Sequence, residues 1–200
     1  GLQMLFNKYK RMLKEDIHNN FIYYFILSVL FIAGNIIGPI LFKKLTWEYN
    51  SMIVKFLNPY IDNLTYKDHS LSIIFRNRIF SNLIYMIILF LLGTFSQGLY
   101  LIPILILYKG IVVGFIVSYL IYSYSFKGFL ISIIGIYPQN IFITMSFIFL
   151  GALTMSISKG MSFRKGRQIY GQEYVFIATI YLLVLIVLSL IEGYFTYKII

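Results

Sequence analysis

Two ionisable side chains interrupt long apolar stretches of this sequence, and chemistry inside a membrane would need residues of this kind. Lys109 lies near the middle of one apolar run, and Glu192 lies near the end of another. Charged groups are costly in hydrocarbon and usually face a helix bundle, an aqueous cavity or each other. The pair therefore predicts a contact in the protein core or a transport path. Snorkelling of each side chain to the membrane surface is the alternative.

The longest apolar run contains a third interruption, in the stretch "IIGIYPQNIFI". Its special residues are Gly135, Pro138, Gln139 and Asn140. Proline removes a backbone donor, and hydrocarbon cannot satisfy amide side chains. We expect the helix to break or kink strongly at Pro138, with the amides and freed carbonyls holding the Lys109 ammonium, together with Glu192, in a structural lock. The alternative is a simple proline kink whose amides bond locally.

Two glycine pairs have the spacing that lets membrane helices approach closely. Gly34 and Gly38 form one G-x-x-x-G pair, and Gly110 and Gly114 form another directly after Lys109. Each pair leaves a flat strip on one helix face. We expect helix packing at both strips, and the Gly34/Gly38 strip could serve an internal contact or a homodimer.

Signatures of catalysis are mostly absent from the sequence. It has no cysteine, no G-x-x-x-x-G-K-[ST], no H-E-x-x-H and no G-x-S-x-G. His18 and His69 lie outside the apolar runs, and Glu192 is the one acidic residue within such a run. We therefore expect a protein that is not an enzyme, with no catalytic residues, no metal site and no cofactor.

Composition indicates an integral membrane protein. The chain has 200 residues, of which 60% are hydrophobic and only 12% are charged, and a soluble domain of this size could not bury so much apolar surface. The net charge of +10 comes from basic residues that mostly flank the apolar runs, as expected beside anionic lipid headgroups. We therefore expect membrane lipid as a partner and no nucleic acid.

The apolar runs predict an all-α fold, a polytopic bundle of five transmembrane helices. The expected spans are about 21–42, 79–97, 99–124, 128–158 and 175–197. Gly98 would form the tight turn between the second and third spans. Residues 1–20 would form a tail and residues 21–200 a single integral membrane domain. Basic residues divide evenly between the two sides, so charge alone does not orient the chain.

The segment 43–78 is the one sizeable part outside the expected spans. Its apolar residues recur on one face of a helix, which predicts a short interfacial helix, and Ser70 is a plausible N-cap for a second. The helices could rest on lipid or dock a partner protein. The residues that we expect to bind a partner are Trp47, Met52, Phe56 and Tyr60.

Three stretches together resemble one protein family. They are "LYKGIVVGFIVSYL" (Leu107 to Leu120), "KGFLISIIGIYPQNIFI" (Lys127 to Ile143) and "LIEGYF" (Leu190 to Phe195). Their order and spacing resemble those of stage II sporulation protein M from endospore-forming bacteria. The N-terminal half is similar through its charged tail, the glycine pair in its first span and the loop that follows.

The resemblance implies a five-span protein of the cell membrane, located at the sporulation septum. Its N-terminus would be cytoplasmic, and the loop 43–78 and the C-terminus would be extracytoplasmic. Members of the family act as scaffolds for the wall hydrolases stage II sporulation protein D and stage II sporulation protein P during engulfment. The alternative is a small transporter or channel component that uses a broken helix with Lys109 and Glu192.

Overall fold

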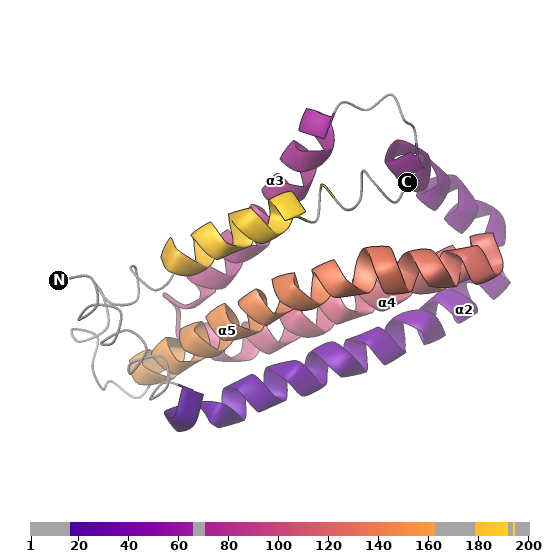
Figure 1. Ribbon diagram of the computed structural model, residues 1–200. Helices are drawn as coiled ribbons and strands as arrows, with labels where there is room; N and C mark the ends of the chain where they lie inside the picture. The colour runs from indigo at the N-terminus through magenta and orange to yellow at the C-terminus, as the bar shows by residue number, and fades with distance from the viewer. Residues whose placement is uncertain (1–16, 66–70, 163–178, 192–193, 195–200) are drawn as a thin grey trace.

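The structure is a computed structural model that describes residues 17–65, 71–162, 179–191 and 194. Every regular element in those ranges is a helix, as the apolar runs predict. Figure 1 shows α2, α4 and α5 lying side by side, with α3 and the helix Thr179–Ile191 along α4 and α5 on the side away from α2. The expected all-α class is confirmed in the described ranges.

The helix α2 is much longer than the first expected span. α2 extends over Phe21–Thr65, 45 residues, and includes the stretch in which a separate interfacial helix was expected. Neither glycine nor proline lies between Leu45 and Asn58, so nothing in the sequence stops the helix where the lipid-facing part ends. α2 also continues through Pro59. Figure 1 shows the last part of α2 turning away from the line of the first part.

The second helix likewise joins two expected pieces. α3 runs over Leu71–Leu92, so the expected helix after Ser70 and the second span form one element; Ser70 itself lies outside the described residues. The turn that follows lies at residues 93–97, where the Thr94 N–H donates to the Leu91 carbonyl oxygen at 2.9 Å.

The expected tight turn at Gly98 is therefore wrong, because Gly98 is the first residue of α4 (Gly98–Ile131). A Cβ added to Gly98 would overlap the carbonyl oxygen of Leu92 at the end of α3. The glycine thus permits a close approach between two helix ends instead of making the turn.

α4 contains one residue with non-helical backbone angles, Ser125 (φ 50°, ψ −126°). Beyond it, a Cβ added to Gly128 would overlap the carbonyl oxygen of Leu120. Residues eight positions apart in a straight helix are about 12 Å apart along its axis, so the chain must reverse at Ser125. This is the boundary that the sequence indicates between its third and fourth apolar runs, and Figure 1 shows the chain running out along α4 and returning.

The returning arm passes through a π-helical turn, η1 (Ser132–Ile136), into α5 (Tyr137–Ser162). The Tyr137 N–H donates to the Ser132 carbonyl oxygen, five residues back. The expected break at Pro138 is not confirmed, because the helix continues through this residue. Pro138 is the second residue of α5, and the wider π-turn directly precedes it.

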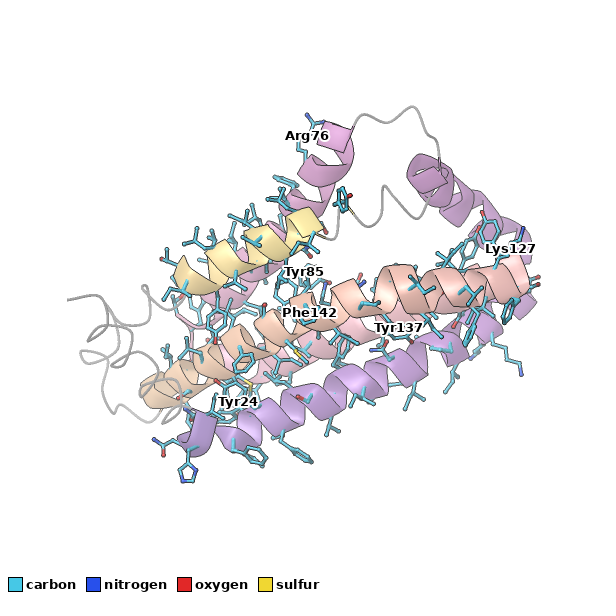
Figure 2. All side chains as sticks on the ribbon, in the orientation of Figure 1. Tyr24, Arg76, Tyr85, Lys127, Tyr137 and Phe142 are labelled. Carbon is cyan, nitrogen blue, oxygen red and sulfur yellow. The ribbon has the colours of Figure 1, made fainter. Side chains whose placement is uncertain are left out.

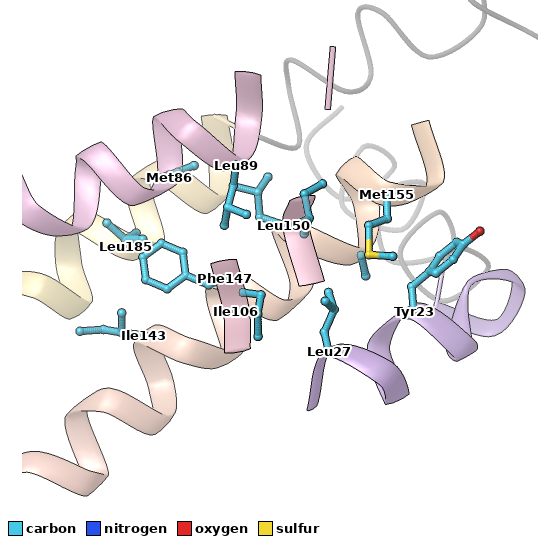
Figure 3. Packing of buried hydrophobic residues seen from close by; sticks show 12 residues of the cluster. Tyr23, Leu27, Met86, Leu89, Ile106, Ile143, Phe147, Leu150, Met155 and Leu185 are labelled. Atoms are coloured by element: carbon cyan, nitrogen blue, oxygen red, sulfur yellow. The ribbon is translucent and has the colours of Figure 1, made fainter. Parts of the chain in front are cut away.

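The main core lies where all five helical segments meet (Figure 3). Its buried members are Tyr23 and Leu27 from α2, Met86 and Leu89 from α3, Ile102 and Ile106 from α4, Ile143, Phe147, Leu150, Ala152 and Met155 from α5, and Leu185 from Thr179–Ile191. Phe147 and Leu89 have no exposed surface. Segments far apart in the sequence therefore share one interior.

Three stretches are long and apolar enough to cross a membrane: Phe21–Leu45, Gly98–Ile134 and Asn140–Lys159. Two shorter apolar helices are Ile79–Leu92 and Thr179–Ile191. Many large apolar side chains point outward, and on α2 they include Ile22, Phe25, Val29, Ile32, Ile36 and Ile40. Such outer faces are those of a membrane protein. Five crossings stay a prediction.

Candidate functional site

The two glycine pairs pack directly against each other where α2 meets α4. A Cβ added to Gly34 would lie 2.9 Å from the carbonyl carbon of Gly110, and one added to Gly38 would lie 2.9 Å from that of Gly114. We call these four residues the glycine seam. Because backbone meets backbone there, the contact has no room for any side chain.

Asn35 is a polar residue directly after the seam residue Gly34, and its backbone packs against Gly114 of α4. The Nδ2 group of Asn35 donates to the carbonyl oxygen of Phe31 on its own helix at 2.9 Å. Its buried Oδ1 accepts no hydrogen bond in the part of the chain that the structure describes. The Gly34/Gly38 strip is covered by α4 within one chain, so a homodimer through this strip would require the two helices to separate.

Lys109, directly before the seam residue Gly110, lies between two aromatic rings from other helices. Its Nζ is 4.9 Å from the ring centroid of Tyr85 on α3 and 4.8 Å from that of Phe147 on α5. The two rings are themselves in contact, with centroids 5.8 Å apart. A cation over an aromatic face is stabilised by about 2 kcal/mol or more when the pair is shielded from water. We call this group the lysine clamp.

The two ring contacts are not among those that the expected lock named. Asn140, the amide expected near Lys109, donates from Nδ2 to the Ile136 carbonyl oxygen on its own helix at 3.0 Å, as in the local alternative. The helix stays continuous across Pro138, and a lock around Lys109 stays a prediction. Gly135 lies in η1 and Gln139 in α5.

Glu192, the remaining member of the expected lock, lies outside the described residues. Its proposed contact with Lys109 therefore stays a prediction.

A second polar contact, not expected from the sequence, joins α3 to Thr179–Ile191. The Nδ2 group of Asn82 donates to the Oγ of Ser189 at 3.0 Å, and both residues are buried. The signal was available: an amide within an expected span calls for a partner in the same way as Asn140 does. Tyr85 and Phe147 gave no such signal, because aromatic residues are common in apolar helices.

The expected docking residues all lie on α2 beyond its apolar part. Met52, Phe56 and Tyr60 are four residues apart, so their positions fall on one side of the helix. At about 100° per residue, the position of Trp47 falls on the opposite side. The continuous helix therefore separates Trp47 from the other three.

In the described ranges, no cluster of three or more His, Cys, Asp or Glu side chains could hold a metal ion. Several of the described polar side chains bond to carbonyl oxygens on their own helix, but two of them join different helices. Lys109 contacts rings from two helices, and Asn82 bonds across to Ser189. The arrangement is that of a packed interior.

Comparison with known proteins agrees with the resemblance seen in the sequence. The model of the stage II sporulation protein M family matches residues 27–197. No curated protein and no solved structure was found to match. Since the matched region covers most of the chain, the chain belongs to the stage II sporulation protein M family.

Proposed function

We propose that this protein is a non-enzymatic membrane scaffold that recruits and positions peptidoglycan hydrolases at the sporulation septum during engulfment. The family match over residues 27–197 is the observation that carries the proposal. The proposed partners are stage II sporulation protein D and stage II sporulation protein P, which would supply the hydrolytic chemistry. In this role the protein gathers enzymes at one place on the membrane.

The use of polar groups between the helices supports a packing role over a solute path. The ammonium of Lys109 lies against two rings, and the Asn82 amide bonds to Ser189. A transporter of the broken-helix type would direct such groups at its substrate. Here they join one helix to the next, as a rigid platform for partners requires.

The proposed orientation has five membrane crossings, a cytoplasmic N-terminus and an extracytoplasmic C-terminus. The part of α2 that continues beyond Leu45 to Thr65 would then stand on the side of the cell wall. Met52, Phe56 and Tyr60 share one side of that extension. We assign the docking of the wall hydrolases to this side.

The test is co-purification from membranes solubilised in mild detergent. One variant replaces the proposed docking side by Met52→Gln, Phe56→Gln and Tyr60→Gln. A matched control, Val54→Gln, makes the same kind of change about 160° around the same helix from Phe56. Proteins D and P should accompany the wild type and the control, and the docking variant should lose them while eluting as a folded species.

Failure of the wild type to bring down either hydrolase would contradict the scaffold proposal. Loss of the partners in the control as well would remove the assignment to one side of the helix. Purified protein in liposomes is the second arm of the test. A solute or proton flux that disappears in Lys109→Met would favour a transporter instead.

A further inference from the structure

The end of the bundle at which α4 reverses carries lysine and aromatic side chains from two separate parts of the chain. We call this group the basic end. Its members are Lys43, Lys44, Tyr122, Tyr124, Phe126 and Lys127. All six are exposed. They have no role in the docking of hydrolases proposed above.

Packing beneath the surface brings the two parts together. Phe42 is 5% exposed and lies in a buried cluster with Tyr119 and Leu120 of α4. Its ring centroid is 5.7 Å from that of Tyr122. Lys43 and Lys44 follow Phe42 directly, so they are held beside this end of α4.

The reversal at Ser125 supplies the third lysine. Gly128 packs against the carbonyl oxygen of Leu120, which holds the neighbouring Lys127 at the same end of the bundle. Figure 2 shows Lys127 at this end, close to the place where α2 turns. The fold therefore gathers ammonium groups from two distant parts of the sequence, Lys43 and Lys44 from one and Lys127 from the other.

The surroundings of these lysines are those of a lipid headgroup layer. Phe126 is 71% exposed and Tyr122 54%, and exposed aromatic residues beside lysines are typical of the boundary between hydrocarbon and water. In the described part of the chain, Lys43, Lys44 and Lys127 form no ion pair. Glu48, four residues after Lys44 on α2, is the nearest acidic residue along the chain.

We propose that the basic end binds the phosphate of an anionic phospholipid, of the phosphatidylglycerol class, in the adjacent leaflet. Each ammonium offers three hydrogen-bond donors to the phosphate oxygens. The exposed rings would lie along the glycerol and upper acyl region. Near an anionic surface each lysine contributes about a fivefold increase in affinity, and Glu48 should oppose binding.

The experiment measures which lipids the protein retains. The protein is reconstituted in nanodiscs with equal amounts of phosphatidylglycerol and phosphatidylcholine and then released gently, and bound lipids are counted by native mass spectrometry. The wild type is compared with Lys43→Gln/Lys44→Gln/Lys127→Gln. The control is Lys159→Gln, which removes an exposed lysine from the last turn of α5.

The wild type and the control should retain phosphatidylglycerol in preference to phosphatidylcholine, and the triple variant should lose that preference. Each single lysine change should lower it about fivefold, and Glu48→Gln should raise it. Because the three lysines are exposed, the variants should elute and unfold in detergent as the wild type does.

Several results would overturn the proposal. One is an unchanged preference in the triple variant, and another is an equal loss in Lys159→Gln. Displacement of the lipid by inorganic phosphate at equal concentration would assign the site to free phosphate. If the triple variant retains phosphatidylglycerol but loses an acidic protein that the wild type binds, the basic end would be assigned to protein binding.

Discussion

Two contacts in this molecule hold helices together by opposite means. Between α2 and α4, the glycine seam brings backbone against backbone, with no side chain in between. Along α3, the contacts are made by side chains: Tyr85 covers the Lys109 ammonium, and Asn82 bonds to Ser189 on the helix Thr179–Ile191. The seam needs the absence of side chains, whereas the contacts of α3 need particular side chains.

The difference follows from the solvent that surrounds such helices. Lipid is as apolar as a leucine side chain, so burial of apolar surface does little to join two membrane helices. Close van der Waals contact and polar bonds between helices remain as the driving forces. The seam uses the first force and the contacts of α3 use the second. The two regions should therefore respond differently to substitution.

The largest effect is expected at the seam, from Gly110→Ala. The new methyl group would overlap the Phe31 carbonyl oxygen and approach the Cα of Gly34, and neither backbone can move without separating the helices. The matched control is Gly151→Ala on α5, where the methyl group would meet only side-chain ends, Leu27 Cδ1 at 3.0 Å and Ile102 Cγ2 at 3.2 Å.

Both substitutions gain the same helix propensity, so their difference isolates packing. Gly110→Ala should be less stable than Gly151→Ala by about 2 kcal/mol, as measured by unfolding in mixed detergent micelles. Equal stability of the two variants would show that the seam is not the tight contact described here.

A smaller effect is expected from the lysine clamp, where the informative quantity is coupling. Lys109→Met and Phe147→Leu, made singly and together, should give a coupling free energy of about 1 kcal/mol, because either change removes the same cation–ring contact. The measurement is again unfolding in mixed micelles. A parallel cycle of Lys159→Met with Phe147→Leu should give a value near zero. Coupling of the same size in both cycles would mean that the clamp has no specific energy.

The smallest effect is expected for the bond between Asn82 and Ser189. Hydrogen bonds between membrane helices average about 0.6 kcal/mol, and a double-mutant cycle of Asn82→Leu with Ser189→Ala should return a coupling of that order. Ser28→Ala provides the comparison, since its Oγ donates to the Tyr24 carbonyl oxygen within one helix at 2.8 Å. A cycle of Asn82→Leu with Ser28→Ala should show no coupling. Coupling in this cycle would mean that the effect reflects general destabilisation.

Much of the helical class could be predicted from the sequence, because apolar run length reports membrane crossing almost directly. The boundary near Ser125 and the presence of glycine strips also follow from local patterns. The join between the first span and the following amphipathic stretch could not be predicted in this way. A change of polarity does not end a helix, no breaker lies near Leu45, and α2 continues even through Pro59.

The site was harder to predict, since a side chain's partner depends on how helices are rotated against each other. Lys109 was found from its charge alone, but its aromatic partners come from helices whose rotation no periodicity in this chain specifies. Pro138 was given too much weight as a helix breaker. Its place in the first turn after a π-helical segment could not be deduced from the composition of the run.

The reversal at Ser125 also bears on how the protein is made. Only Ser125, between the outgoing and returning arms, departs from helical geometry. The link is therefore too short for one arm to enter the bilayer while the other stays in water. If both arms cross as proposed, they must be delivered as a preformed hairpin, in one step. Residues 98–162 would then insert into the membrane as a single unit. A chain truncated between the two arms would form no stable inserted intermediate.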